Sequence, residues 1–497
     1  MKLRWLVPTL IGAATPALAT PRFQDLSDTL PRHVYDGGWE HFVGGGVAVF
    51  DCNGDARPEI LAAGGTNPML FLRNRGDMVF EAGPFPTLTG ATGAYPLDLD
   101  GDGILDLYIL RAGADRVLRG GANCRFEDVT DAWGFPQDDR WTTAFTAWWE
   151  DGASRLTLAI GHYVDRSNPE GPFEACDTNS LMIPQTEGWR EERLEPGFCA
   201  LSMLASRDAR GRPTLRISND RHYYVRGGYE QMWDIAEHRF LTPEDGWQHV
   251  SLWGMGIASR DLDGDGRDEV MLTSMGDQLL QIAQPDGTYA PAPYAMGTYA
   301  TLPHDGSDGR PSTGWHAQFG DVDNDGRADL FIAKGNVDQM PTNAIEDPND
   351  LLMQQADGTF VQRATEAGVA TRTRARGAAL ADLDGDGALD LVVINRRAPM
   401  ELYRNVTPGR GHWIALDLRQ PGANSRAVGA VVTVESAAGM QGQQVTVGGG
   451  HAGGQALPLH VGLGSATEVV IRVEWPDGRV SRVESGVDRV LTLSPQE

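Results

Sequence analysis

Residues 261–269 read DLDGDGRDE, and this nine-residue acidic loop recurs through the chain. The other copies are DCNGDARPE (51–59), DLDGDGILD (98–106), DVDNDGRAD (321–329) and DLDGDGALD (382–390). Each copy has oxygen-bearing side chains at loop positions 1, 3, 5 and 9, and an apolar run follows it at once. A loop of this kind that joins two strands, repeated along the chain, is typical of a repeat fold.

The loop spacing predicts a site for a hard divalent cation, which prefers six to eight oxygen ligands. An EF-hand would need Glu at position 12 and a helix after it. Position 12 is apolar in every copy and falls in an expected strand, so we reject the EF-hand and predict about five structural Ca²⁺ ions. The predicted ligands are Asp51, Asn53, Asp55, Glu59, Asp98, Asp100, Asp102, Asp106, Asp261, Asp263, Asp265, Glu269, Asp321, Asp323, Asp325, Asp329, Asp382, Asp384, Asp386 and Asp390.

The first loop is the weakest of the predicted sites. Asn53 replaces a carboxylate there, Ala56 stands where the turn favours Gly, and Glu59 replaces Asp. An uncharged ligand and a non-glycine turn residue both lower the expected affinity for a cation.

The intervals between loops predict the architecture. The loops start at 51, 98, 261, 321 and 382, so the second interval of 163 residues has room for two degenerate units, which we place at 144–160 and 206–217. Seven units of four short strands predict an all-β fold with a seven-bladed β-propeller. The last unit lacks its final strand, and we expect residues 23–26 (FQDL) to complete it and close the ring.

The repeat stops after residue 408. Residues 412–494 alternate apolar and polar positions in short runs, which predicts a small antiparallel β-sandwich or barrel. We therefore divide the chain into a signal peptide (1–19), a propeller (20–408) and a separate C-terminal β domain (409–497).

The N-terminus predicts export. Lys2 and Arg4 precede an apolar stretch that ends in Ala17-Leu18-Ala19, as in a cleaved signal peptide. We expect a secreted or periplasmic protein with no membrane span. The formal net charge of −26 repels phosphate backbones, so nucleic acid is excluded as a partner.

Four cysteines would be oxidised in such a compartment. Cys176 and Cys199 lie in one irregular, proline-rich insertion, and we favour a disulfide between them. Cys52 and Cys124 would then form the second pair by default.

The sequence resembles the FG-GAP/VCBS-repeat calcium propellers with a C-terminal ASPIC/UnbV domain, the cartilage acidic protein-like family. The resemblance rests on GMGIASRDLDGDG (254–266), FGDVDNDGRADLFIAKG (319–335), NSRAVGAVVTV (424–434), LHVGLG (459–464) and VEWPDG (473–478). It implies calcium in each intact loop. The chain departs from the family at His451-Ala452-Gly453-Gly454, where relatives usually have an aromatic residue and a Ser-Gln pair.

Three functions are compatible with these features. The first is a non-enzymatic, monomeric binding or adhesion module for an extracellular glycan or protein, because no nucleophile or paired-carboxylate constellation is found. The second is a polysaccharide lyase or hydratase, for which His162, His222 and Tyr224 would be candidate acid–base groups. The third is an assembly factor for another exported protein. Fold alone does not choose between them.

Overall fold

The computed structural model describes residues 20–150, 152–169, 175–186, 188–220, 227–299 and 310–495. The predicted signal peptide (1–19), His222 and Tyr224 lie outside these ranges. The predicted all-β class is confirmed, because helix accounts for only 4 % of the structure. None of the helices in the described ranges is long and apolar enough to cross a membrane.

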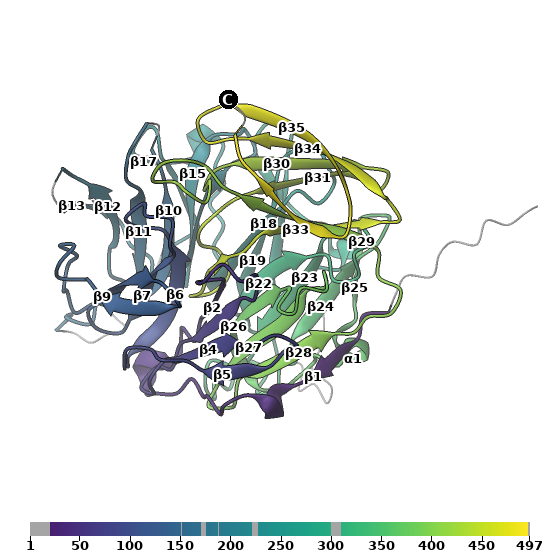
Figure 1. Ribbon diagram of the computed structural model, residues 1–497. Helices are drawn as coiled ribbons and strands as arrows, with labels where there is room; N and C mark the ends of the chain where they lie inside the picture. Colours follow the sequence, from purple (N-terminus) through teal and green to yellow (C-terminus); the bar gives the residue numbers. More distant parts are fainter. Residues whose placement is uncertain are drawn as a thin grey trace, which may run out of the picture.

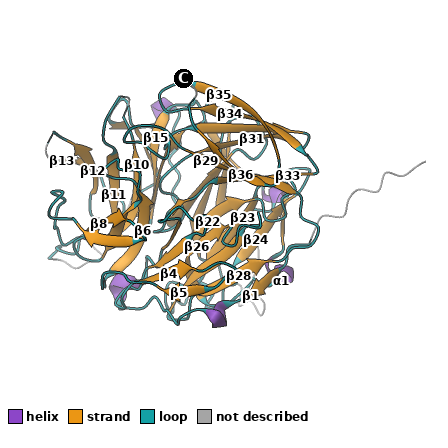
Figure 2. Cartoon of the chain, in the orientation of Figure 1, coloured by secondary structure: helices purple, strands orange, loops and turns teal. Residues whose placement is uncertain are grey.

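Seven antiparallel sheets are formed by the described residues before position 408 (Figures 1 and 2). The first holds β2 (Val47–Phe50), β3 (Glu59–Ala62), β4 (Leu70–Asn74) and β5 (Phe80–Ala82). The second holds β6 (Ala91–Leu97), β7 (Asp106–Arg111), β8 (Arg116–Gly121) and β9 (Arg125–Asp128). The third holds β10 (Thr142–Trp148), β11 (Thr157–His162), β12 (Asn179–Pro184) and β13 (Trp189–Leu194).

The fourth sheet holds β14 (Ala200–Arg207), β15 (Pro213–Asn219), β16 (Gln231–Asp234) and β17 (Arg239–Phe240). The fifth holds β18 (Gly254–Arg260), β19 (Glu269–Ser274), β20 (Leu279–Ala283) and β21 (Tyr289–Pro291). The sixth holds β22 (Gly314–Gly320), β23 (Asp329–Lys334), β24 (Asp350–Gln354) and β25 (Phe360–Gln362). The seventh holds β26 (Arg374–Ala381), β27 (Asp390–Arg396), β28 (Glu401–Asn405) and β1 (Phe23–Asp25).

Two further sheets follow in the tail. One contains β29 (His412–Leu418), β33 (Leu459–Gly464) and β36 (Arg489–Leu493). The other contains β30 (Val431–Ser436), β31 (Gly439–Gln444), β34 (Glu468–Glu474) and β35 (Val480–Gly486). The helical pieces are short: η1 (Ser27–Thr29), η2 (Trp39–His41), η3 (Pro243–Asp245), η4 (Tyr294–Met296) and α1 (Ala364–Ala367).

The first seven sheets form a closed propeller. The innermost strands β2, β6, β10, β14, β18, β22 and β26 each contact the next, and β26 contacts β2. β1 pairs with β28, with Phe23 opposite Asn405, so the N-terminal strand completes the last sheet as expected. We interpret each sheet as one blade. The two degenerate units predicted from sequence correspond to β10–β11 and β14–β15.

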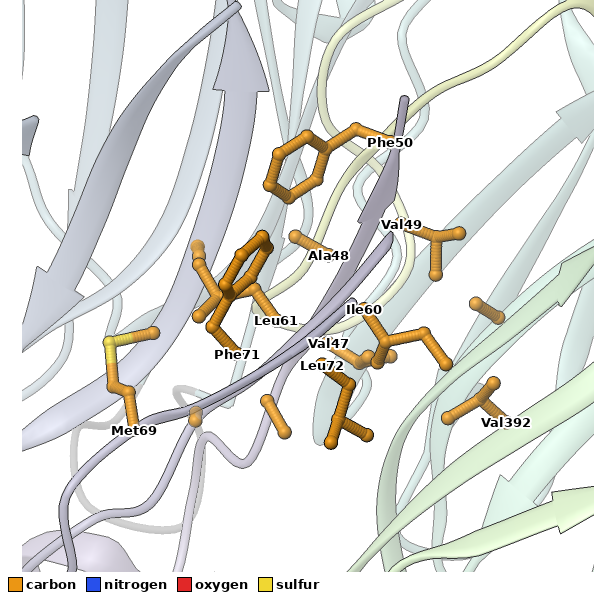
Figure 3. Packing of buried hydrophobic residues seen from close by; sticks show 14 of the residues in the cluster. Val47, Ala48, Val49, Phe50, Ile60, Leu61, Met69, Phe71, Leu72 and Val392 are labelled. Atoms are coloured by element: carbon orange, nitrogen blue, oxygen red, sulfur yellow. The ribbon is translucent and has the colours of Figure 1, made fainter. Parts of the chain in front are cut away.

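Apolar side chains on both faces of a sheet hold each blade between its neighbours. Figure 3 shows this for the first sheet, where Phe50 and Phe71 lie on one face while Val49 and Ile60 point toward Val392 of the last sheet. The Phe50 and Phe71 rings stack with centroids 6.4 Å apart. Because side chains alternate along a strand, a sheet with both faces buried needs apolar residues at successive positions.

Both predicted disulfides are present, Cys52–Cys124 and Cys176–Cys199. The first joins the loop after β2 to the turn between β8 and β9, and therefore links the first two blades. The second ties the insertion after β11 to the residue before β14. Cross-links of this kind are compatible with an extracytoplasmic location.

The tail differs from the prediction of a separate antiparallel domain in two respects. β29 pairs in parallel with β36, with Ile414 opposite Arg489, so its sheet is mixed. In addition, β32 (Gln455–Ala456) leaves the tail and pairs in parallel with β2 of the propeller. The tail sheets themselves share a buried apolar core that includes Trp475.

The segment 447–456 runs through the axis of the propeller. Its hydrogen bonds reach the innermost strands of the first six sheets, whereas the tail sheets lie over one face (Figure 1). The backbone bonds are Gly454 N to Ala94 O (3.1 Å), Gly449 N to Met203 O (2.7 Å) and Gly450 N to Ile257 O (2.6 Å). Thr146 Oγ1 also donates to Val447 O. The tail therefore fills the space that an open propeller would leave along its axis.

Glycine is required where this segment meets the inner strands. A Cβ atom at Gly46 or Gly93 would lie 1.8 Å or 1.7 Å from the carbonyl oxygen of Ala452. A Cβ at Gly453 would lie 2.2 Å from the carbonyl oxygen of Val47. Backbones can approach so closely only where the side chain is absent.

A pair of neutral histidines lies at the centre of the axis. His451 is fully buried; its Nδ1 lies 3.2 Å from Met255 O, and its Nε2 accepts the Gly44 amide at 3.1 Å. The His451 amide donates to Nδ1 of His316 at 3.0 Å. Burial lowers the pKa of His451 to about 3 and that of His316 to about 4. In each ring, protonation would convert the nitrogen that accepts a backbone N–H into a donor, and two donors would then face each other. Both contacts therefore require the neutral form of the ring.

Gly93→Ala is expected to destabilise the protein by about 1–3 kcal/mol, because the added methyl group must displace the axial segment. The matched control is Gly38→Ala, since a Cβ at Gly38 meets nothing within 4 Å and its φ is −75°. Urea unfolding of both variants measures the difference. Equal midpoints for the two variants would contradict the close approach.

The histidine pair predicts a loss of stability in acid. The unfolded chain takes up protons below about pH 6.5 while the folded chain does not until about pH 4, so each histidine lowers the free energy of unfolding by about 1.4 kcal/mol per pH unit in this window. Urea unfolding at several pH values between 7 and 4.5 gives the free energy of unfolding as a function of pH. This free energy should fall less steeply with decreasing pH in His316→Gln than in the wild type. His238→Gln is the control, because His238 is 47 % exposed, and an unchanged slope in His316→Gln would contradict the argument.

Candidate metal centres

All five acidic loops connect the first and second strands of a blade, so they lie on one face of the propeller. The carboxylate at position 1 organises each loop by accepting backbone amides from inside it. In the second loop, Asp98 Oδ1 accepts from Gly101 N at 2.8 Å and Asp98 Oδ2 accepts from Gly103 N at 2.9 Å. The residues equivalent to Asp98 are Asp51, Asp261, Asp321 and Asp382.

The sixth loop position needs a left-handed backbone. Gly103 has a φ of +88°, and Ala56 of the first loop adopts +61° in spite of its methyl group. The left-handed region is unfavourable for residues with a Cβ, so the first loop is strained at the position where the sequence departs from the pattern.

The carboxylate at position 9 ties the loop to the rest of its blade. Asp106 Oδ2 accepts the Leu99 amide at 2.8 Å, and its Oδ1 accepts the Gly120 amide on β8, also at 2.8 Å. Glu269, Asp329 and Asp390 make the same two types of bond. This acid therefore connects three segments of the blade, and the same contacts hold its oxygens in place.

Four loops bring three carboxylates together. Within each of these trios the ligand oxygens lie within 4.8 Å of one another. The trios are Asp98, Asp100 and Asp106; Asp261, Asp263 and Asp265; Asp321, Asp323 and Asp325; and Asp382, Asp384 and Asp390. Two oxygens on a Ca²⁺ ion lie at most about 5 Å apart, since each sits at 2.3–2.6 Å from it. The fourth predicted ligand of each loop, respectively Asp102, Glu269, Asp329 and Asp386, lies outside its trio.

The first loop does not assemble a trio from its predicted ligands. Glu59 groups there with Cys52 and Cys124, whose sulfurs are joined in a disulfide and do not ligate metal. Asn53 Nδ2 donates to Asp55 Oδ2 at 3.1 Å, so this pair is satisfied within the loop. Asp51 accepts the backbone amides of Gly54 and Ala56, as the first aspartate does in every loop, so this contact does not distinguish the first loop from the others.

The loop at 321–329 is the most deeply buried. Asp323 is 2 % exposed, and its Oδ1 is buried without a hydrogen-bond partner. Burial and the neighbouring carboxylates raise the pKa values of Asp321 and Asp329 well above the usual range, and burial raises the pKa of Asp325 to about 6. An oxygen-only donor set with a buried, unpaired carboxylate oxygen fits a hard cation such as Ca²⁺.

Arginines neutralise part of the negative charge on the acidic loops, including Arg327 beside Asp325 in the loop just described. Arg119 lies 2.8 Å from Asp100 and 2.9 Å from Asp102, and Arg404 lies 2.6 Å from Asp384. Burial is again the main reason that the pKa of Asp106 rises to about 7 and that of Asp382 to about 6.

The tail covers the face that carries these loops. Ser425 Oγ donates to Asp98 Oδ2 at 2.5 Å, and Gly411 N donates to the backbone oxygen of Asp323 at 3.0 Å. A Cβ at Gly462 would lie 1.9 Å from Asp321 Oδ2. His460 Nε2 lies 3.1 Å from Gly387 O in the last loop. The acidic loops therefore form the surface on which the tail sheets rest.

Sequence reasoning missed the contact of Ser425 with Asp98 and the position of His451 in the propeller axis. Nothing around Ser425 indicated a contact with a loop far away in the sequence. His451 did leave a signal, since it lies in the segment where the chain departs from the family pattern.

The candidate acid–base residue His162 is buried between the second and third blades. Burial holds its pKa well below the usual value, and its Nδ1 lies 3.3 Å from Thr142 Oγ1. Thr142 also donates to Asp115 at 3.0 Å, and burial raises the pKa of Asp115 to about 7. The adjoining cavity measures about 30 Å³, which suits a water molecule and not a polysaccharide.

Parts of the chain match two known families. Residues 51–109 and 261–332 match the FG-GAP-like repeat family, and residues 420–497 match the ASPIC and UnbV family. The chain therefore carries FG-GAP-like repeats followed by an ASPIC and UnbV domain. It is similar to "Cartilage acidic protein 1" of Xenopus tropicalis, with 22 % identity over 524 residues that cover 95 % of this chain and 77 % of the relative.

Several solved structures are similar to the chain. BBS1N in complex with ARL6DN aligns with 78 % of this chain and 98 % of its own at 10 % identity and a TM-score of 0.46. The Dos1 propeller aligns with 76 % of this chain and 95 % of its own at 11 % identity and a TM-score of 0.36. PorZ is a surface component of the type-IX secretion system of Porphyromonas gingivalis. It aligns with 89 % of this chain and 59 % of its own at 11 % identity and a TM-score of 0.40. The combination of FG-GAP-like propeller and UnbV domain suggests a binding or adhesion module.

Proposed function

We propose that this protein is an exported, calcium-stabilised binding protein that holds an extracellular glycan or protein without chemical turnover. The observation that carries the proposal is the axial segment 447–456, which fixes the tail to six blades. Propeller and tail then present one rigid surface, and a preorganised surface loses little entropy on binding.

Calcium has a structural role in this proposal. The acidic loops support the tail, and without cations their carboxylates would repel one another across the same face. Extracellular sites bind Ca²⁺ with a Kd of about 0.1–1 mM, so about 1 mM Ca²⁺ contributes on the order of 0.4–1.4 kcal/mol per site. Several such sites together approach the net stability of a domain.

An enzymatic role has less support in the described ranges. His162 is buried beside a cavity of about 30 Å³, too small for a sugar chain. No specific observation favours the assembly-factor alternative, and stable co-purification with another exported protein would be its signature.

Calcium removal is expected to lower the melting temperature of the mature protein, because the loop carboxylates lose their counterions. For each variant we compare the melting temperature in 1 mM Ca²⁺ with that in EDTA. A mutation that destabilises the protein in general lowers both temperatures, so its effect cancels in their difference. Asp323→Ala should reduce this difference more than Asp55→Ala, since Asp323 belongs to a buried trio and Asp55 does not. An unchanged melting temperature in EDTA would refute the structural role of calcium.

Binding without turnover is tested by incubating the mature protein with neutral and acidic polysaccharides in millimolar Ca²⁺, followed by size-exclusion chromatography. We expect protein to co-elute with polymer of unchanged size. A fall in polymer size would overturn the proposal in favour of an enzyme. If neither component moves, the glycan part of the proposal is refuted, and a protein partner is the ligand to look for next.

A further inference from the structure

A polar cavity lies at the seam between the last two blades and the start of the tail. Its volume is about 340 Å³, and its lining includes Asp386 from the last loop, Arg410, His412 and Trp413 from the beginning of the tail, and Asp488 from the turn before β36. Ligand pockets commonly measure about 300–1,000 Å³, so the cavity can hold a small ligand or one unit of a longer one.

An ion pair and a hydrogen bond hold the polar walls of the cavity in place. Arg410 lies 3.1 Å from Asp386 Oδ2, and it also donates to the backbone oxygens of Asn405 and Thr407 at 3.0 and 3.3 Å. His412 Nδ1 lies 2.7 Å from Asp488 Oδ2. Both carboxylates of the lining are therefore held in place by nitrogen donors at the start of the tail.

Trp413 is a fixed aromatic wall of the same cavity. A Cβ at Gly387 would lie 1.9 Å from the indole, so the ring packs directly on the glycine backbone of the last loop. The ring is nearly parallel to that of His460, at 12° and with centroids 6.3 Å apart. The Trp413 amide also donates to Asp488 Oδ1 at 3.2 Å, which links the aromatic wall to the His412–Asp488 contact.

We infer that this cavity binds a neutral, hydroxyl-rich saccharide unit, an inference that rests on the proposed binding function and locates its site. A sugar hydroxyl both donates and accepts, and the Arg410–Asp386 and His412–Asp488 contacts each place a nitrogen beside a carboxylate acceptor. The C–H face of a pyranose is apolar and packs on an indole ring. Two carboxylates in the lining, Asp386 and Asp488, repel acidic sugars.

The test is binding of the full-length mature protein, in 1 mM Ca²⁺, to an array of immobilised neutral and acidic saccharides. We expect binding to neutral saccharides, weakened about tenfold or more by Trp413→Ala and by Asp488→Asn, since each removes roughly 1.4 kcal/mol or more of contact. Asp488 is about half exposed, so the conservative Asp488→Asn is expected to fold, and a melting curve in Ca²⁺ verifies it.

Control variants come from residues outside the lining of the cavity. Trp39→Ala removes a tryptophan that is 42 % exposed, and His238→Gln removes a histidine that lies 3.6 Å from Glu192. Both should leave binding within about twofold of the wild type. If the wild type binds neutral saccharides and the Trp413 and Asp488 variants bind equally well, the site is wrong while the proposed function stands. Binding to acidic saccharides alone overturns the ligand class, and a wild type that binds no saccharide overturns the inference together with the glycan part of the proposed function.

Discussion

The contact on which the rest of the structure depends is the passage of a backbone through the propeller axis. An inner strand has unpaired N–H and C=O groups facing the axis, and buried groups of this kind need partners. Residues 447–456 provide them, and Gly44, from the opposite end of the chain, closes the same contact by donating to His451. The N-terminal segment, the inner strands and the tail therefore meet in one hydrogen-bonded centre.

This constraint gives the acidic loops a second role beside the cation binding that we propose for them. They form the surface against which the tail packs, as at Ser425 on Asp98 and Gly462 on Asp321. The loops thus lie at an internal boundary, where a carboxylate is desolvated and its repulsion from neighbours is strengthened. A cation in these loops would lower the cost of packing the tail over them, so stability of the blades and docking of the tail become coupled.

Much of this fold could be predicted from the sequence, because its local rules repeat. The loops fixed the first and second strands of five blades, the FQDL stretch identified the closing strand, and both disulfides followed from the position of the insertion. The axial segment could not be predicted, since a glycine-rich stretch has no hydrophobic period and its partner β2 is about 400 residues away. The carboxylate trios were only partly predictable: Asp106 accepts one amide from its own loop and one from β8, which loop spacing alone does not reveal.

The first loop illustrates how one means of stabilisation can replace another. It lacks a carboxylate at Asn53, has a strained Ala56 and assembles no trio of its predicted ligands. It is also the loop that a disulfide fastens to the second blade, through Cys52 and Cys124. Glu59 Oε2 lies 3.0 Å from Cys52 Sγ, so the acid at position 9 is packed against the cross-link. A disulfide limits the conformations of the unfolded chain irrespective of calcium, so the first loop does not need a bound ion to stay attached to the second blade.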